Sequence, residues 1–466
     1  MKLILETITN FKLTDQLDFA KMSGDFNPIH LDQNYARRSI AGDVAVHGIN
    51  LVFWSLNQFL KLKKSEIKIK KINIIFSKFI NINQNIKLKI FQKKKRFFFN
   101  FFESDILVSD FEIEYERNKK KKDLYSINKF VKKKSQTLNL ENFKTNEKFI
   151  ENSSINELQL KKKYLYLHKY LSLSQIIDFA TITRFVGMRV PGRDSILSKL
   201  NLFYKSNKAS KNQFKIVSVD KRFNLVNLYY KGKSLSGNIR TLMRPKKINQ
   251  DIENKDLKVN KKEFVKQKAL IIGGSKGLGE ATVKILSLGS ARILFSYFRG
   301  KKDAHQHRKA FKKNIKIFHL NIEKRINLNT LKDIKNFKPT HFYYFATPRI
   351  FSGSGYEFVE KNFEIFNNYY LTGFQKIFNQ LDKKILKSVF FPSSVAINQV
   401  TNKLCEYACS KAAQEILLKY LSQKYKTINF LCPRLPRLKT DQTLSILDHK
   451  SELPFRRMLK LIKKIK

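Results

Sequence analysis

The feature that most constrains the fold of this chain is an apolar segment, residues 269–272, which runs into a glycine-rich turn and then into an apolar helix. Further strand-like segments follow it, with helical patterns between them, at residues 292–296, 315–320, 341–345 and 388–392. Such alternation is typical of a parallel sheet with crossover helices. We therefore expect a doubly wound α/β domain over residues 263–466.

The first 246 residues follow a different pattern, in which helices precede a group of strands. Within residues 1–118 we expect two helices and three strands, at 14–20, 48–60, 67–75, 86–91 and 97–102. Residues 156–246 repeat this order with a helix and four strands, at 173–185, 198–204, 214–219, 225–230 and 236–243. Polar, lysine-rich linkers are expected from residue 119 to about 155 and over 246–262. The chain thus divides into two small α+β units and one doubly wound unit.

Taken alone, the net charge would indicate a nucleic-acid or anionic-membrane partner. The chain has 92 Lys+Arg against 38 Asp+Glu, a formal net charge of +54. The excess is spread along the whole sequence and comes with no helix-turn-helix, zinc-finger or RNA-binding aromatic motif. We therefore expect no specific nucleic-acid partner. The charge indicates either compositional bias on solvated faces or a general attraction to acidic cofactors and acyl carriers. A non-catalytic nucleic-acid- or membrane-binding protein is the remote alternative.

The three cysteines, Cys405, Cys409 and Cys432, are too few for a disulfide framework and lack the spacing of a zinc site. No apolar run reaches the roughly 18–20 residues that a membrane helix needs. The apolar start of the chain is too short for a signal peptide. We expect a cytoplasmic protein with no membrane span and no metal.

The most specific string in the chain covers residues 19–30, Phe-Ala-Lys-Met-Ser-Gly-Asp-Phe-Asn-Pro-Ile-His. It places Asp25 and His30 five residues apart around a segment rich in turn-forming residues. A carboxylate and an imidazole held in this way can share one water molecule and pass protons to and from a substrate. Gly48 opens the next apolar helix, where its backbone N–H can stabilise a developing oxyanion.

This string resembles the signature of the MaoC-like, (R)-specific enoyl-CoA hydratase family, which has an α+β hot-dog fold. The resemblance implies that Asp25 and His30 are the acid/base pair that adds water to a trans-2-enoyl thioester or removes it. It also implies that the Gly48 N–H is the oxyanion donor to the thioester.

The middle segment, residues 156–246, has the element order of a second hot-dog, so that the two halves would form a double hot-dog within one chain. Nothing in it matches the Ser-Gly-Asp-x-Asn-Pro-x-His string. We therefore expect a non-catalytic half that helps to shape the acyl tunnel. A second site made by Arg184, Gly187, Arg193 and Asp194 is the less favoured alternative.

A second group of chemistry-bearing residues accompanies the glycine-rich turn. Glycines let the backbone approach a pyrophosphate, and the start of the following helix supplies N–H donors. Tyr407 and Lys411 are four residues apart and therefore share one helix face. Ser394 precedes them at the end of an apolar strand.

Together these residues resemble the classical short-chain dehydrogenase/reductase family over nearly all of residues 263–443, with its Rossmann-like fold. The resemblance implies that Tyr407 donates a proton to a carbonyl during hydride transfer and that Ser394 orients this carbonyl. Lys411 would lower the pKa of the phenol and hold the nicotinamide ribose. The residues implied to bind the cofactor are Gly273, Ser275, Lys276, Gly277, Leu278, Gly279, Arg299, Asn321, Ala346, Tyr407 and Lys411.

The end of the second strand of this domain bears on the choice of cofactor. It carries no carboxylate to bind a ribose 2′-OH, whereas Arg299 follows it and Lys276 stands in the turn. These two cations favour a 2′-phosphate, so we expect NADP(H), with NAD(H) as the alternative.

Several positions depart from this family. Ile272 stands where a threonine is usual, Asn321 replaces an aspartate near the adenine, and Tyr370 occupies the place of the asparagine in the proton relay. Residues 344–347, Tyr-Phe-Ala-Thr, replace Asn-Asn-Ala-Gly, and Pro-Arg replaces Pro-Gly at 433–434. The Ser-Tyr-Lys set is intact, so we expect a divergent but catalytic member.

We therefore predict a bifunctional acyl-thioester enzyme, an NADP(H)-dependent 3-oxoacyl reductase joined to an (R)-3-hydroxyacyl dehydratase/enoyl hydratase. These are consecutive steps of fatty acid metabolism, on a substrate carried by coenzyme A or an acyl-carrier protein. The alternative joins the hydratase to a reductase for an unrelated ketone or sugar-like substrate in a secondary or surface-glycan pathway. A homodimer is expected by analogy.

Overall fold

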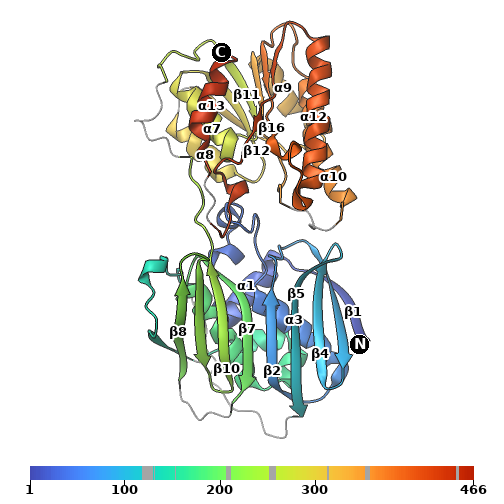
Figure 1. The fold of residues 1–466 in the computed structure, drawn as a ribbon, viewed down its shortest axis with the longest axis vertical. Helices are drawn as coiled ribbons and strands as arrows, with labels where there is room; N and C mark the ends of the chain where they lie inside the picture. The colour runs from blue at the N-terminus through green and yellow to red at the C-terminus, as the bar shows by residue number, and fades with distance from the viewer. Residues whose placement is uncertain are drawn as a thin grey trace. The chain divides into compact units, whose positions relative to one another are not determined.

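The computed structural model describes residues 1–117, 130, 132–152, 154–205, 211–250, 259–311, 314–351, 357–447 and 451–466. Within these residues the chain forms two compact units, coloured blue to green and yellow to red in Figure 1. The first unit comprises Met1–Lys246 and a short segment that begins at Ser445, and the second comprises most of the rest. The lysine-rich stretch at 119–122, and residues 251–258 of the second expected linker, lie outside the described residues.

An antiparallel sheet, in which the described residues form ten strands, organises the first unit. Its strand order is β1-β3-β4-β5-β2-β7-β10-β9-β8-β6. Counted outward from the central pair β2 and β7, the two halves of the sheet have the same order of strands. The strands are β1 (Lys2–Asn10), β2 (Ile67–Phe76), β3 (Asn85–Lys93), β4 (Arg96–Glu103), β5 (Ile106–Arg117), β6 (Lys148–Glu151), β7 (Ser195–Tyr204), β8 (Asn212–Asp220), β9 (Leu225–Lys231) and β10 (Leu235–Met243).

Helices cover one face of this sheet (Figure 1) and share one hydrophobic core with it. Every residue of α6 is buried, including polar side chains such as Gln175 and Asp178, which hydrogen-bond to neighbouring strands. The expected helices at 14–20, 48–60 and 173–185 are confirmed, each slightly longer than predicted. The helices are α1 (Leu13–Ser23), α2 (Gln33–Ala36), α3 (Gly48–Lys63), α4 (Glu157–Lys163), α5 (Leu165–Tyr170) and α6 (Leu173–Met188).

The linker expected to reach residue 155 is wrong at its end, because β6 lies within it. This strand pairs with β8 at the edge of the sheet, with Phe149 opposite Phe214. Only alternate residues of an edge strand contact the core, so Phe149 and its neighbours carry a weak apolar signal among many polar residues. The same reason explains why β1, at the other edge, was not predicted.

In the second unit the described strands form a six-stranded parallel sheet of order β13-β12-β11-β14-β15-β17. This is the 3-2-1-4-5-6 order of a Rossmann fold, which confirms the predicted doubly wound sheet. The elements are β11 (Lys268–Ile272), α7 (Gly277–Leu288), β12 (Arg292–Tyr297), α8 (Lys301–Ala310), β13 (Ile315–His319), α9 (Leu328–Phe337), β14 (His341–Tyr344), α10 (Glu360–Asn367), α11 (Phe374–Phe378), β15 (Ser388–Phe390), α12 (Cys405–Lys424), β17 (Asn429–Leu431) and α13 (Pro454–Lys463). A separate two-stranded pair joins β16 (Ser393–Ser394) to β18 (Arg434–Leu435).

Both faces of this sheet are buried. Leu270 and Ile272 of β11 belong to the core shared with α10, α11 and α12, whereas Ala269 and Ile271 belong to the core shared with α7 and α13. Figure 1 shows α10 and α12 on one side of the sheet and α7 and α13 on the other. The near-continuous apolar runs of its strands follow from burial on both faces.

Two further findings concern membrane-spanning helices and the cysteines. None of the helices in the described residues combines the length and the apolarity needed to cross a membrane. Cys405, Cys409 and Cys432 are all free thiols.

A prediction follows from the contact between α6 and β2. Pairing of β2 with β7 runs from Lys71 to Ile75, so Ile69 lies beyond it. Instead, the Gln175 side chain accepts a hydrogen bond from the Ile69 N–H (2.9 Å) and donates one to the Ile69 carbonyl (2.7 Å). Gln175→Leu leaves two buried backbone groups unpaired and should lower the free energy of unfolding by about 2–6 kcal/mol. Urea denaturation measures this, with Gln213→Leu on the exposed face of β8 as the control. Equal stability of the two variants would contradict the prediction.

Candidate active sites

The structure brings together the three residues predicted to act in the first unit. Asp25, His30 and Gly48 line one pocket, which otherwise has mostly apolar walls. Side chains from both halves of the unit form these walls, among them Ile29, Leu51, Phe76, Val186, Ile196 and Leu242. The pocket therefore offers an apolar chain a place beside a carboxylate and an imidazole.

The Asp25 carboxylate is only 2% exposed and has a donor on each oxygen. The Asn27 N–H donates to Oδ1 at 3.2 Å, and the Thr183 hydroxyl donates to Oδ2 at 2.7 Å. Burial raises the pKa of Asp25 to about 6, against the opposing effects of these hydrogen bonds and of the Arg184 charge. Asp25 can therefore exchange protons near neutral pH, as a general acid/base requires.

His30 presents a free ring nitrogen to the same space. Its Nδ1 lies 2.8 Å from the Ala45 carbonyl oxygen, which can only accept, so Nδ1 carries a proton. Burial lowers the pKa of His30 to about 4, so the ring is neutral at pH 7 and Nε2 keeps its lone pair. The neutral ring can thus accept a proton or a hydrogen bond from water.

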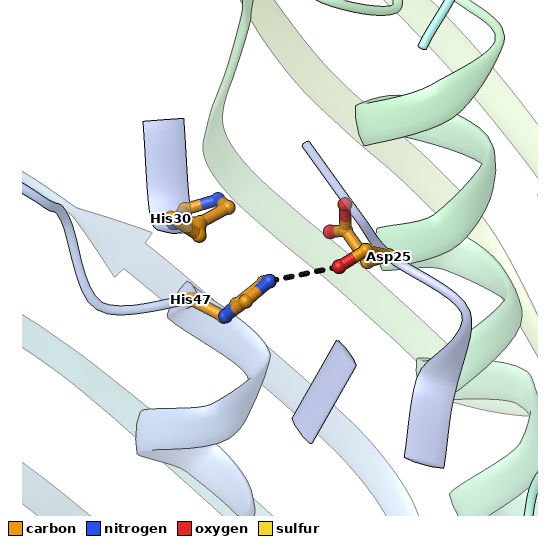
Figure 2. Close-up of side chains that lie close together, drawn as sticks. All are labelled: Asp25, His30 and His47. Atoms are coloured by element: carbon orange, nitrogen blue, oxygen red, sulfur yellow. Dashed lines mark hydrogen bonds between the residues drawn. The ribbon is translucent and has the colours of Figure 1, made fainter. Parts of the chain in front are cut away.

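His47 is a neighbour whose role was not predicted (Figure 2). Its ring stacks on that of His30 with centroids 3.8 Å apart, and its Nε2 lies 3.1 Å from the Asp25 carbonyl oxygen. Its Nδ1 lies 2.9 Å from Gln16 Oε1, so the ring connects the Asp25 loop to α1. An Asp25 oxygen and one nitrogen of each histidine lie within 4.8 Å of one another, a spacing that can hold a metal ion. Because both His47 nitrogens already face protein oxygens, the contacts favour a structural role.

Gly48 is the first residue of α3, so its N–H has no acceptor inside the helix. The helix dipole also favours negative charge near this N–H. A Cβ at this position would lie 2.8 Å from the Phe76 ring. Glycine therefore lets this aromatic wall of the pocket close over the donor.

Three of the four residues considered as a second site, Arg184, Gly187 and Arg193, contact the loop that carries Asp25. Arg184 Nη1 donates to the Ser23 carbonyl at 3.0 Å, just before Asp25. Carbonyl oxygens of Gly187 and Arg193 accept hydrogen bonds from the Asn27 amide, at 2.9 and 3.2 Å. Asp194 accepts from the hydroxyl of Tyr35. The sequence singles out these residues but does not indicate which groups they contact.

In the second unit, the predicted cofactor residues follow parallel strands. Residues 273–279 follow β11, Arg299 follows β12, Asn321 follows β13 and Ala346 follows β14. Because parallel strands end at one edge of the sheet, these residues gather at its carboxyl edge, where such folds bind ligands. Asn321 caps its own loop by accepting the Glu323 N–H at 3.1 Å.

The glycine-rich turn has the tight geometry that a pyrophosphate cradle needs. Gly273 has φ 87°, and a Cβ there would lie 2.9 Å from the Ala346 nitrogen. A Cβ on Gly279 would lie 2.1 Å from the Gly273 carbonyl oxygen, so only glycine lets α7 begin this close to the turn. Lys276 is the N-cap residue of α7, and the first N–H groups of this helix have no acceptor within the helix itself. These residues fit a dinucleotide cofactor.

Ser394, Tyr407 and Lys411 also come together, with one difference from expectation. Burial raises the pKa of Tyr407, and a hydrogen bond with Ser394 opposes this rise. Lys411, expected to lower the pKa of Tyr407, donates to the Pro392 carbonyl (2.9 Å) and to Gln414 Oε1 (2.7 Å). Burial lowers the pKa of Lys411 itself to about 7, which weakens its charge at neutral pH.

Two of the departures from the reductase pattern, Tyr370 and Thr347, meet beside Tyr407 and Lys411. Tyr370 lies in a π-helical segment, Asn368–Gly373, with its ring centroid 6.0 Å from that of Tyr407. Its hydroxyl lies 2.6 Å from Thr347 Oγ1, and Lys411 Nζ lies 3.9 Å from the centre of its ring. A phenol and a hydroxyl thus stand where an amide was expected, in contact with the predicted lysine. The sequence revealed the substitutions but not that these residues meet.

Comparisons with known proteins agree with parts of this description. The family described as "MaoC like domain" matches residues 6–105. The chain is 31% identical over 179 residues to "Uncharacterized oxidoreductase YKL071W" of Saccharomyces cerevisiae, which covers 34% of this chain and 69% of that protein.

Solved structures resemble part of the chain. They include the oxidoreductase yciK of Escherichia coli, with a TM-score of 0.39 and 14% identity over 45% of this chain and 93% of that one. A short-chain dehydrogenase from Escherichia coli CFT073, solved with NADPH, has a TM-score of 0.39 and 13% identity over 44% and 92%. The strand order of the second unit by itself identifies its Rossmann-like sheet.

The buried charge of Asp25 leads to a prediction about stability. The unfolded carboxyl ionises at about 3.8 and the folded one at about 6, so the folded state loses stability as pH rises through this interval. Asp25→Asn removes the cost and should stabilise the protein by up to about 3 kcal/mol at pH 8, but not below pH 4. Thermal or urea unfolding at both pH values measures the difference.

Asp178 provides the contrast, since burial also raises its pKa to about 6. It accepts hydrogen bonds from the Tyr230 hydroxyl and from the backbone N–H groups of Lys233, Ser234 and Leu235. The NH₂ group of an asparagine at this position would face hydrogen-bond donors that now bind the carboxylate, so Asp178→Asn should destabilise the protein at pH 8. Destabilisation by Asp25→Asn at pH 8 would contradict our description of its site.

Proposed function

The chain belongs to the same family as the Saccharomyces cerevisiae oxidoreductase, and we propose a bifunctional enzyme that acts on acyl thioesters. Its residues 6–105 match the MaoC-like domain, which has a hot-dog fold. Its first unit would be an (R)-3-hydroxyacyl dehydratase/enoyl hydratase, and its second an NADP(H)-dependent 3-oxoacyl reductase. The observation that carries the proposal is the convergence of Asp25, His30 and Gly48 on one apolar pocket. The equal strand order of the two sheet halves supports a double hot-dog as its frame.

The two pKa shifts suggest how protons move during hydration. A water molecule between Asp25 and His30 Nε2 can donate a hydrogen bond to each. Its oxygen attacks the β-carbon of the enoyl thioester, and its proton goes to Asp25, whose pKa of about 6 exceeds that of His30, about 4. The Gly48 N–H stabilises the negative charge on the thioester oxygen. Asp25 then gives the proton to the α-carbon, so that the elements of water are added and Asp25 is restored.

In the second unit, Tyr407 would donate a proton to the carbonyl oxygen of a 3-oxoacyl thioester, which Ser394 orients by a hydrogen bond. A bound NADP(H) would supply the hydride, and residues 273–279 would hold its pyrophosphate. Arg299 and Lys276 are the residues that we propose for the 2′-phosphate. The product is a 3-hydroxyacyl thioester, which is the substrate for dehydration in the first unit. Joining the two sites on one chain raises the effective concentration of this intermediate.

A second candidate keeps the hydratase and gives the reductase an unrelated ketone. The aromatic cluster around Tyr370 and Thr347 favours it, because it changes the surroundings of the predicted relay. Reduction of another carbonyl, with no reduction of 3-oxoacyl thioesters, would support this candidate.

The hydratase proposal predicts a loss of activity with a defined pH dependence. Asp25→Asn should lower kcat for hydration of crotonyl-CoA by about 10²–10⁴-fold, because the amide cannot take the proton from water. In the wild type, kcat/KM should fall below about pH 6, where Asp25 becomes protonated. Loss of crotonyl-CoA absorbance measures both, and Tyr407→Phe serves as the control that keeps the hydratase site. Full activity of Asp25→Asn would exclude the mechanism.

The reductase proposal predicts the reverse pattern. Tyr407→Phe should lower the rate of NADPH oxidation with acetoacetyl-CoA by about 10²–10⁴-fold, because the proton donor is lost. Asp25→Asn should leave this rate unchanged. If the wild type oxidises no NADPH with any 3-oxoacyl thioester, the assignment of the reductase substrate is wrong.

A further inference from the structure

We propose that Thr183 is a positioning residue for Asp25, and that the second half of the first unit therefore supplies part of the hydration site. This inference rests on the proposed hydratase function. Thr183 lies on α6, and its hydroxyl donates to Asp25 Oδ2 over 2.7 Å. Both side chains are buried, with 6% and 2% of their surfaces exposed, so water does not compete freely for this bond.

Gly187 adds a steric requirement on the same helix face. It follows Thr183 by four residues, which places both on one side of α6. A Cβ on Gly187 would lie 2.4 Å from Asp25 Oδ1, closer than any carbon can approach an oxygen without displacing it. The helix thus leaves a gap for one carboxylate oxygen and offers a donor to the other.

The Asn27 loop completes this arrangement. Its N–H donates to Asp25 Oδ1, while its side-chain amide donates to the Gly187 carbonyl at 2.9 Å. The loop that carries Asp25 is therefore fastened to the helix that orients the carboxylate. With one donor on each oxygen, the plane of the carboxylate is fixed relative to the pocket.

The Thr183 hydroxyl stabilises the ionised form of Asp25 more than the protonated form, because the carboxylate is the better acceptor. Besides Lys78, which lines the same pocket, the charged and titratable groups that the structure places around Asp25 are Arg184 on α6, His30, and His47 before α3. A valine at position 183 would leave all three in place. Loss of the hydroxyl should then raise the pKa of Asp25 further above its ordinary value.

Thr183→Val, which keeps the shape of the side chain, tests the proposal. The low-pH limb of crotonyl-CoA hydration should move up by about one to two pH units, and kcat at pH 7 should fall by about 2- to 10-fold. Thr183→Ser, which keeps the hydroxyl, should restore the wild-type limb. Gly187→Ala should abolish hydration while NADPH oxidation continues.

Thr181→Val is the matched control. Thr181 is also buried on α6, but its hydroxyl donates to the Ile177 carbonyl of its own helix. Its variant should show the wild-type pH profile. An equal shift in Thr181→Val and Thr183→Val, or no shift in Thr183→Val, would overturn the proposal in favour of a purely structural threonine.

A direct titration separates this inference from the proposed activity. Carbon-13 NMR of protein labelled at aspartate carboxyl groups, with Asp25→Asn to assign the signal, gives the pKa of Asp25 without substrate. A higher midpoint in Thr183→Val supports the inference even if the wild type hydrates no enoyl thioester, which would refute only the proposed function. An unchanged midpoint refutes the inference.

Discussion

The antiparallel pairing of β2 with β7 is the interaction on which the first unit depends. It joins five strands from each half into one sheet, with Ile72 opposite Leu202 and Ile74 opposite Leu200 at the buried centre. Because the sheet is continuous, α6 packs into the same core as α1 and α3. This packing brings a helix of the second half against the loop that carries Asp25. The site is therefore a product of the pairing of the halves and does not belong to one half alone.

This packing buries the Asp25 carboxylate. A charge removed from water is costly unless donors replace the water, and Asp25 has a limited set of donors compared with Asp178. Asp178, with a phenol and three backbone N–H groups around it, is fully engaged in structure. Burial raises the pKa of both carboxyl groups to about 6, but of the two it is Asp25 that lines the pocket, beside His30. This difference in surroundings separates a residue suited to proton transfer from one that maintains the fold.

The parts of the site that could be predicted from sequence lie in short strings of residues. Asp25 and His30, the glycines at 273–279, and Tyr407 with Lys411 are each close in the chain, so their spacing alone suggests a turn or a shared helix face. The doubly wound sheet could also be predicted from the sequence, because burial on both faces makes its strands apolar throughout.

Contacts between distant segments could not be predicted in this way. Thr183 and Asp25 are separated by 158 residues, and a threonine in an apolar helix commonly bonds its own backbone, as Thr181 does. The orientation of Lys411 towards Gln414, and the meeting of Tyr370 with Thr347, likewise depend on packing rather than on spacing. Edge strands such as β6 escape notice because half of their residues face solvent.

The most direct test of the account is to incubate the whole chain with acetoacetyl-CoA and NADPH and to identify the products by mass spectrometry. We expect 3-hydroxybutyryl-CoA to form first and crotonyl-CoA to follow from it, because one chain would carry out both steps on one acyl group. Asp25→Asn should stop the sequence at the hydroxy product, and Tyr407→Phe should prevent both. Unchanged acetoacetyl-CoA, with added crotonyl-CoA still hydrated, would contradict the claim that the two units act on a common thioester.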